Sequence, residues 1–166
     1  MRRGIAIIVC LLWMGFIFYQ SSKTSQQSNQ ISYEIVEYIG QSHNQENKIE
    51  NVEVLVSHDN KWSFEKVNVF IRKSAHFFEF FILALLFAWA LTEYQVLGFK
   101  LICYTLVGVL LYAISDEFHQ LFVEGRNGRF FDIMVDFMGG IVALLLIQCG
   151  GYLKKIRFNK LFNSKN

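Results

Sequence analysis

The sequence of 166 residues contains no proline and only three cysteines, and its formal net charge is +2. The absence of proline suits long unbroken helices, because proline removes a backbone donor and kinks or breaks a helix. Cys10, Cys103 and Cys149 are odd in number and each lies in an apolar run, so the sequence suggests neither a disulfide framework nor a zinc motif. The small net charge gives no indication of nucleic-acid binding.

Apolar residues, by contrast, make up 53% of the chain and are gathered into four runs nearly free of charge. A hydrocarbon core of about 30 Å needs roughly 20 helical residues to cross it. We therefore predict an all-α bundle of four transmembrane helices in a single domain, residues 1–166, with the lipid bilayer as its surroundings. The predicted spans are 4–19, 75–92, 96–114 and 133–153.

The charges beside these runs predict a topology. Arg2 and Arg3 precede the first run, and five basic residues follow the fourth. Basic flanks tend to stay in the cytoplasm, so we predict that both termini are cytoplasmic and that residues 20–72 form an extracytoplasmic segment, partly amphipathic and partly irregular. No small-residue cleavage site follows the first run, which favours an uncleaved helix over a signal peptide. The polar residues 20–30 are expected to be solvated and flexible.

Ionisable residues near membrane spans are expensive and usually functional. In the predicted topology they all fall at the outer side, and helical spacing places them on shared faces, as for Asp132 and Asp136. We therefore predict an outward-facing polar site. Its candidate residues are Lys73, His76, Glu79, Asp116, Glu117, Gln120, Arg126, Asp132 and Asp136.

Small residues predict how this site is assembled. Gly139, Gly140 and Ala143 form a strip on which another helix can pack closely, so the aspartates before them should face the bundle. Glycines in the loop 121–131 permit a turn that folds two arginines, Arg126 and Arg129, back over the helix ends.

A purely structural role is the simpler interpretation of the same charges. Lys73 would pair with Glu79 or Asp116, and Arg126 with Asp132, so that no charge is left alone in a medium of low dielectric constant.

Three motifs in order, RKSAHFFEF at 72–80, SDEFHQLFVEGRNGRFFD at 115–132 and DFMGG at 136–140, resemble the VanZ-like family of small bacterial membrane proteins. That family is named for a protein associated with resistance to the glycopeptide teicoplanin. The resemblance implies a four-helix protein of the bacterial plasma membrane with a role in the cell envelope. It does not supply a demonstrated reaction.

Two functional hypotheses follow. In the first, Arg72, Lys73, Arg126 and Arg129 bind the phosphate of an anionic envelope lipid or a peptidoglycan precursor, since arginine binds such groups with two parallel hydrogen bonds.

In the second, the protein is an intramembrane enzyme acting on a phosphorylated or acylated lipid headgroup. His76 or His119 would be the base or nucleophile, Asp116 or Glu117 would orient it, and Arg126 would stabilise charge.

The sequence gives weaker support to two other functions, a metal site and a transporter. A metal site would draw on His76, Glu79, Glu117 and Asp132 or Asp136, but the single His-x-x-Glu runs opposite to the Glu-x-x-His order of helical di-metal sites. We predict no metal and no cofactor. Four helices without proline breaks or repeated halves also argue against a monomeric transporter.

Overall fold

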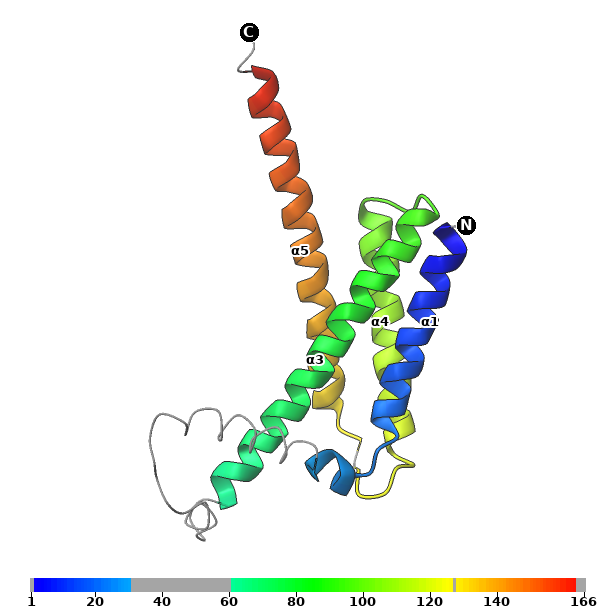
Figure 1. The fold of residues 1–166 in the computed structure, drawn as a ribbon, viewed down its shortest axis with the longest axis vertical. Coiled ribbons are helices and arrows are strands. Elements are labelled where there is room, and N and C mark those ends of the chain that lie inside the picture. The colour runs from blue at the N-terminus through cyan, green and yellow to red at the C-terminus, as the bar shows by residue number, and fades with distance from the viewer. Residues whose placement is uncertain (1, 31–60, 127, 164–166) are drawn as a thin grey trace, which may run out of the picture.

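The computed structural model describes residues 2–30, 61–126 and 128–163, and this part of the chain is helical and contains no strand. The four long helices run in the order in which Figure 1 labels them. They are α1 (Arg2–Ser21), α3 (Lys61–Glu93), α4 (Phe99–Gln120) and α5 (Phe130–Asn163). The predicted all-α fold is therefore confirmed.

Each long helix contains a stretch long and apolar enough to cross a membrane, so the chain is a multi-pass membrane protein. These stretches are Arg2–Ser21, Val69–Glu93, Phe99–Gln120 and Phe130–Gly151. The third extends beyond the predicted end at residue 114, because Asp116, Glu117 and Gln120 turn into the bundle and are buried. The expected amphipathic segment near residues 31–39 lies outside the described residues.

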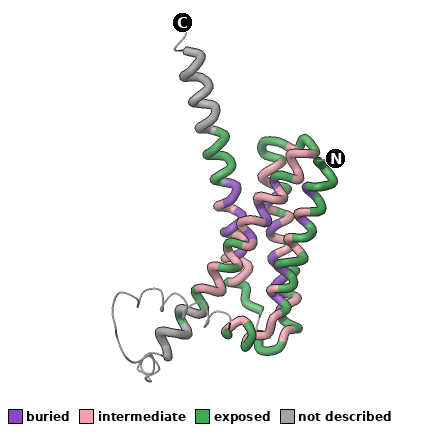
Figure 2. Tube along the Cα trace, in the orientation of Figure 1, coloured by how far each residue is buried: buried purple, intermediate pink, exposed green. Residues whose placement is uncertain are grey.

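The apolar side chains of the helices fall into two groups, one buried in a core and one exposed on the outside of the bundle. The core contains Ile17, Phe80, Leu83 and Val109, all fully buried. Large apolar side chains such as Leu12, which is 69% exposed, point outward on every helix, as expected for a surface in contact with lipid. Figure 2 shows this division as buried segments inside and exposed segments on the outer faces.

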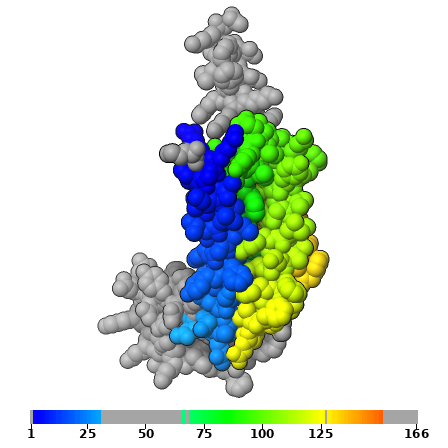
Figure 3. Space-filling model, turned by 90° about the vertical axis from the view of Figure 1, so that its right-hand side faces the viewer, coloured from blue at the N-terminus to red at the C-terminus, as the bar shows by residue number. Residues whose placement is uncertain are grey.

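Helix α1 is held to its neighbours by side chains that bond to backbone oxygens. The indole of Trp13 donates to the carbonyl of Glu79 on α3 at 2.9 Å. The hydroxyl of Tyr112 on α4 donates to the carbonyl of Met14 at 2.6 Å. Figure 3 shows α1 and α4 packed side by side over their length. These bonds fix the depth at which the polar end of α1 meets the other helices.

Two adjacent glycines bring α5 close to α3 and α4. A Cβ atom added at Gly139 would lie only 2.3 Å from the carbonyl oxygen of Phe77, and one at Gly140 would lie 2.9 Å from Cγ1 of Val109. The predicted strip of small residues is therefore a helix contact. Contacts between α3 and α5 are the most extensive in the bundle.

We predict that Gly139→Ala destabilises the protein, by about 1–3 kcal/mol, because the new methyl group overlaps backbone that has little room to move. The matched control is Gly150→Ala on the same helix, where nothing lies within 4 Å of the added atom. Thermal unfolding in detergent would measure both. Equal melting temperatures for the two variants would contradict the close contact.

Candidate functional site

A cavity of about 150 Å³ lies where α4 ends and α5 begins. Helices α3, α4 and α5 contribute to its wall, together with the loop 121–129 and Ser25. Seven of the nine candidate residues line it: Lys73, His76, Glu117, Gln120, Arg126, Asp132 and Asp136. The other two lie beside it. Glu79 Oε2 is 3.8 Å from His76 Nδ1, and a carboxylate oxygen of Asp116 lies within 4.8 Å of ligand atoms of His76 and Asp136.

The polar segment after α1 also belongs to the site, which corrects the expectation that it is merely solvated and flexible. Ser21, the last residue of α1 and part of the polar stretch 20–30, is fully buried. The backbone N–H of Ser25 donates to the carbonyl of Glu124 at 3.4 Å. Figure 3 shows this segment against the loop that follows α4. Its sequence gave no signal of this role, because serines and glutamines are equally common in solvated linkers.

Lys73 pairs with Asp132 across α3 and α5, at 2.5 Å. The expected pairing with Glu79 or Asp116 is therefore wrong. Lys73 and Glu79 are six residues apart on one helix, a rotation of about 240° that points them to different sides. The pair is partly exposed, so it fixes geometry more than it stabilises the fold.

Arg126 reaches back from the loop, as predicted, but it does not pair with Asp132. Its guanidinium donates to the carbonyl of Lys23 at 2.9 Å, to Gln120 Oε1 at 3.1 Å and to Ser28 Oγ at 2.7 Å. All three acceptors are neutral. Arg126 therefore ties the segment after α1 to the end of α4 without giving up its charge.

Three arginines on the cavity wall, Arg72, Arg126 and Arg129, form no ion pair with any residue in the described ranges. Burial, and next the positive charge of Arg72, lowers the pKa of the Arg126 guanidinium from its ordinary value. The group still keeps its charge, because arginine does not lose its proton in proteins. A half-buried cation beside another cation favours an incoming anion.

Beneath these cations lie buried carboxylates. Asp116 is 3% exposed, and its Oδ2 accepts hydrogen bonds from Ser21 Oγ at 2.8 Å and from Gln120 Nε2 at 2.9 Å. Asp136 is 2% exposed, and its Oδ1 lies 3.9 Å from His76 Nδ1. The predicted shared face is thus real: side chains from three helices meet at one end of the bundle.

The two candidate bases of the enzyme hypothesis differ in position. His76 lies in the cavity wall. The ring of His119 instead packs against Phe18 of α1, with 4.1 Å between ring centroids, and is not part of that wall. Glu117, one of the two proposed orienting carboxylates, accepts a hydrogen bond from the backbone N–H of Arg129 and so helps hold the loop.

The fold and site define a class: a four-span membrane bundle with buried carboxylates under a cationic cavity at one end. The chain belongs to the family described as VanZ/LLP1, whose model matches residues 6–151. This match runs from within the first span to the end of the fourth and covers the three motifs on which the resemblance was based. No curated protein and no solved structure matches the chain.

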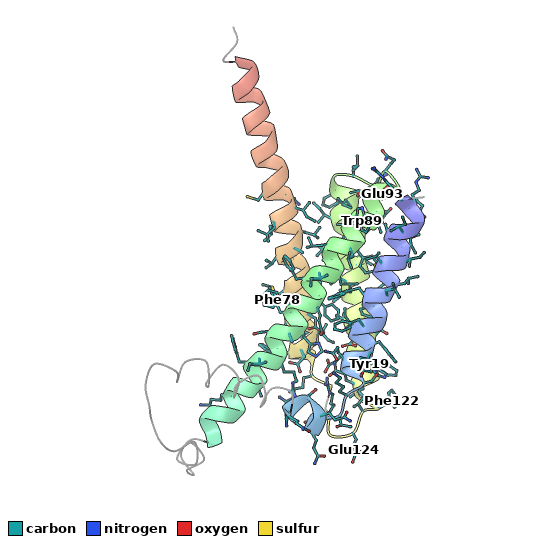
Figure 4. All side chains as sticks on the ribbon, viewed as in Figure 1. Tyr19, Phe78, Trp89, Glu93, Phe122 and Glu124 are labelled. Atoms are coloured by element: carbon teal, nitrogen blue, oxygen red, sulfur yellow. The ribbon has the colours of Figure 1, made fainter. Side chains whose placement is uncertain are left out.

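The predicted topology can be tested at the two ends of the bundle. Figure 4 shows Glu124 in the loop near the cavity and Glu93 at the opposite end. In a background with Cys10→Ala, Cys103→Ala and Cys149→Ala, we expect Glu124→Cys to react with a membrane-impermeant maleimide in intact cells. Glu93→Cys should react only after the cells are permeabilised. The reverse pattern would place the cavity on the cytoplasmic side.

Proposed function

We propose that the cavity binds the phosphate or pyrophosphate headgroup of an anionic envelope lipid or of a lipid-linked peptidoglycan precursor, at the outer face of the plasma membrane. The observation that carries this proposal is the set of three arginines on the wall that have no carboxylate partner among the described residues. Arginine presents several N–H donors in a planar fork that matches phosphate oxygens.

The site's position favours a lipid over a soluble anion. The cavity lies at the end of four apolar helices whose outer faces carry exposed side chains such as Leu111 and Phe118. A lipid with its chains along these faces would have its headgroup at the level of the arginines. The charge attracts the headgroup, and the apolar surface holds the tail.

The wall is also built to hold its shape before a ligand arrives. The Lys73–Asp132 pair joins α3 to α5, and the bonds of Arg126 join the loop to the segment after α1. Preorganised donors lose less conformational entropy on binding than mobile ones do. Each nitrogen of the Arg126 guanidinium donates to a neutral acceptor, which leaves one N–H on Nη1 and one on Nη2 for a phosphate.

We expect Arg72→Gln to weaken binding of a fluorescent polyprenyl diphosphate by about 10- to 100-fold in nanodiscs, the loss typical of a hydrogen bond to a charged group. Arg126→Ala should abolish binding, although it also removes bonds that hold the loop. The matched control is Lys100→Gln, at the start of α4 and away from the cavity. A polyprenol of the same length without phosphate should bind weakly to every variant.

We expect the two arginine variants to have the same effect in cells. If lipid binding underlies a decreased susceptibility to teicoplanin, then Arg72→Gln and Arg126→Ala should lose it while their membrane insertion is unchanged. Wild-type affinity in both variants would contradict the proposal. Release of a product from the labelled lipid, abolished by His76→Ala, would identify an enzyme in place of a binding protein.

A further inference from the structure

Below the arginines, three side chains from three helices converge. One ligand atom each of His76 on α3, Asp116 on α4 and Asp136 on α5 lies within 4.8 Å of the others. His76 Nδ1 is 3.9 Å from Asp136 Oδ1 and 3.8 Å from Glu79 Oε2. These separations are too long for hydrogen bonds. They suit atoms arranged around a shared ion, since ligands about 2.0–2.2 Å from a metal lie roughly 3–4.4 Å apart.

A second observation points to a missing partner. Asp116 Oδ1, Asp136 Oδ1 and Glu79 Oε2 are inaccessible to solvent and accept no hydrogen bond within the part of the chain that the structure describes. Asp116 and Asp136 are both more than nine-tenths buried. A buried polar atom left without a partner costs about 1–3 kcal/mol, and more when it is charged. The two aspartates lie within 4.8 Å of each other and of His76, so their unpartnered oxygens call for a cation.

The orientation of Asp116 fits the same interpretation. Its Oδ2 is held by Ser21 Oγ and Gln120 Nε2, so its Oδ1 remains for another partner. Hydrogen bonds of this kind, made by the atom that does not bind the ion, are what fixes carboxylate ligands in metal sites. Two neutral donors hold Asp116 in place without neutralising it.

We propose that His76, Asp116 and Asp136 bind a first-row transition dication such as Zn²⁺ or Mn²⁺. An imidazole nitrogen disfavours Mg²⁺ and Ca²⁺, which take oxygen ligands. The two aspartates balance the charge of the ion. His76 and Asp136 also line the cavity, so the ion has an open side toward it.

This set differs from the metal site weighed on sequence alone, which took His76, Glu79, Glu117 and either Asp132 or Asp136, and omitted Asp116. Neither Glu117 nor Asp132 belongs to the group of ligand atoms within 4.8 Å of one another. Glu117 Oε1 accepts a hydrogen bond from the Arg129 N–H, and Asp132 pairs with Lys73. The inference does not rest on the proposed lipid ligand, because binding of the ion is measured on protein without lipid.

The experiment uses the full chain, purified in detergent, stripped with a chelator and dialysed against Zn²⁺ or Mn²⁺. We expect one ion per chain by elemental analysis. Asp136→Asn and Asp116→Asn should weaken binding by more than about 10-fold, and Ser21→Ala by about 10-fold through the released carboxylate. The matched control is Glu124→Gln, an exposed carboxylate in the loop after α4 that does not line the cavity, and this variant should bind the ion as the wild type does.

Three results would overturn the site. They are no ion in the wild type, unchanged affinity in Asp136→Asn, or an equal loss of affinity in Glu124→Gln, which would mean a diffuse electrostatic attraction. If the aspartate variants aggregate, Ser21→Ala decides, because it removes no ligand. Unchanged affinity in Ser21→Ala would then contradict the proposed geometry. Failure of lipid binding with a bound ion present would leave this site intact and reject only the proposed function.

Discussion

Two buried carboxylates inside a lipid-embedded bundle set the main constraint on this structure. Asp116 and Asp136 are almost inaccessible, and a carboxylate cannot remain charged in such a place without partners. Ser21 and Gln120 supply them for one oxygen of Asp116. Bringing the two aspartates and these donors together determines where α1 ends, how long α4 is and how closely α5 approaches.

The apolar parts of the molecule serve this arrangement. Gly139 lets α5 approach the backbone of α3 at Phe77, the residue after His76, and this contact sets Asp136 beside that histidine. At the same end, Arg126 draws the segment after α1 over the helix ends. The result is a cavity whose wall carries three arginines and the buried Asp136, with the buried Asp116 beside it.

Much of this follows from the sequence by periodicity. The spacing of Asp136 and Gly139 predicts one helix face, and the position of Arg126 between loop glycines predicts a return toward the helix ends. Individual partners do not follow in this way. Ser21 finds Asp116 across 95 residues of chain, and Lys73 pairs with Asp132, because these contacts depend on helix rotation and on the path of a loop. Local sequence patterns indicate which face of a helix points into the bundle. They do not indicate which side chain of another helix it contacts.

The central claim is that the end of α1 meets the buried carboxylate of α4. In a background without the native cysteines, Ser21→Cys combined with Asp116→Cys should form a disulfide on mild oxidation in membranes, since the side chains they replace are in direct contact. Ser22→Cys combined with Asp116→Cys should not, because Ser22 is exposed and bonds to its own helix. No cross-link in the first pair, or equal cross-linking in both, would contradict the account.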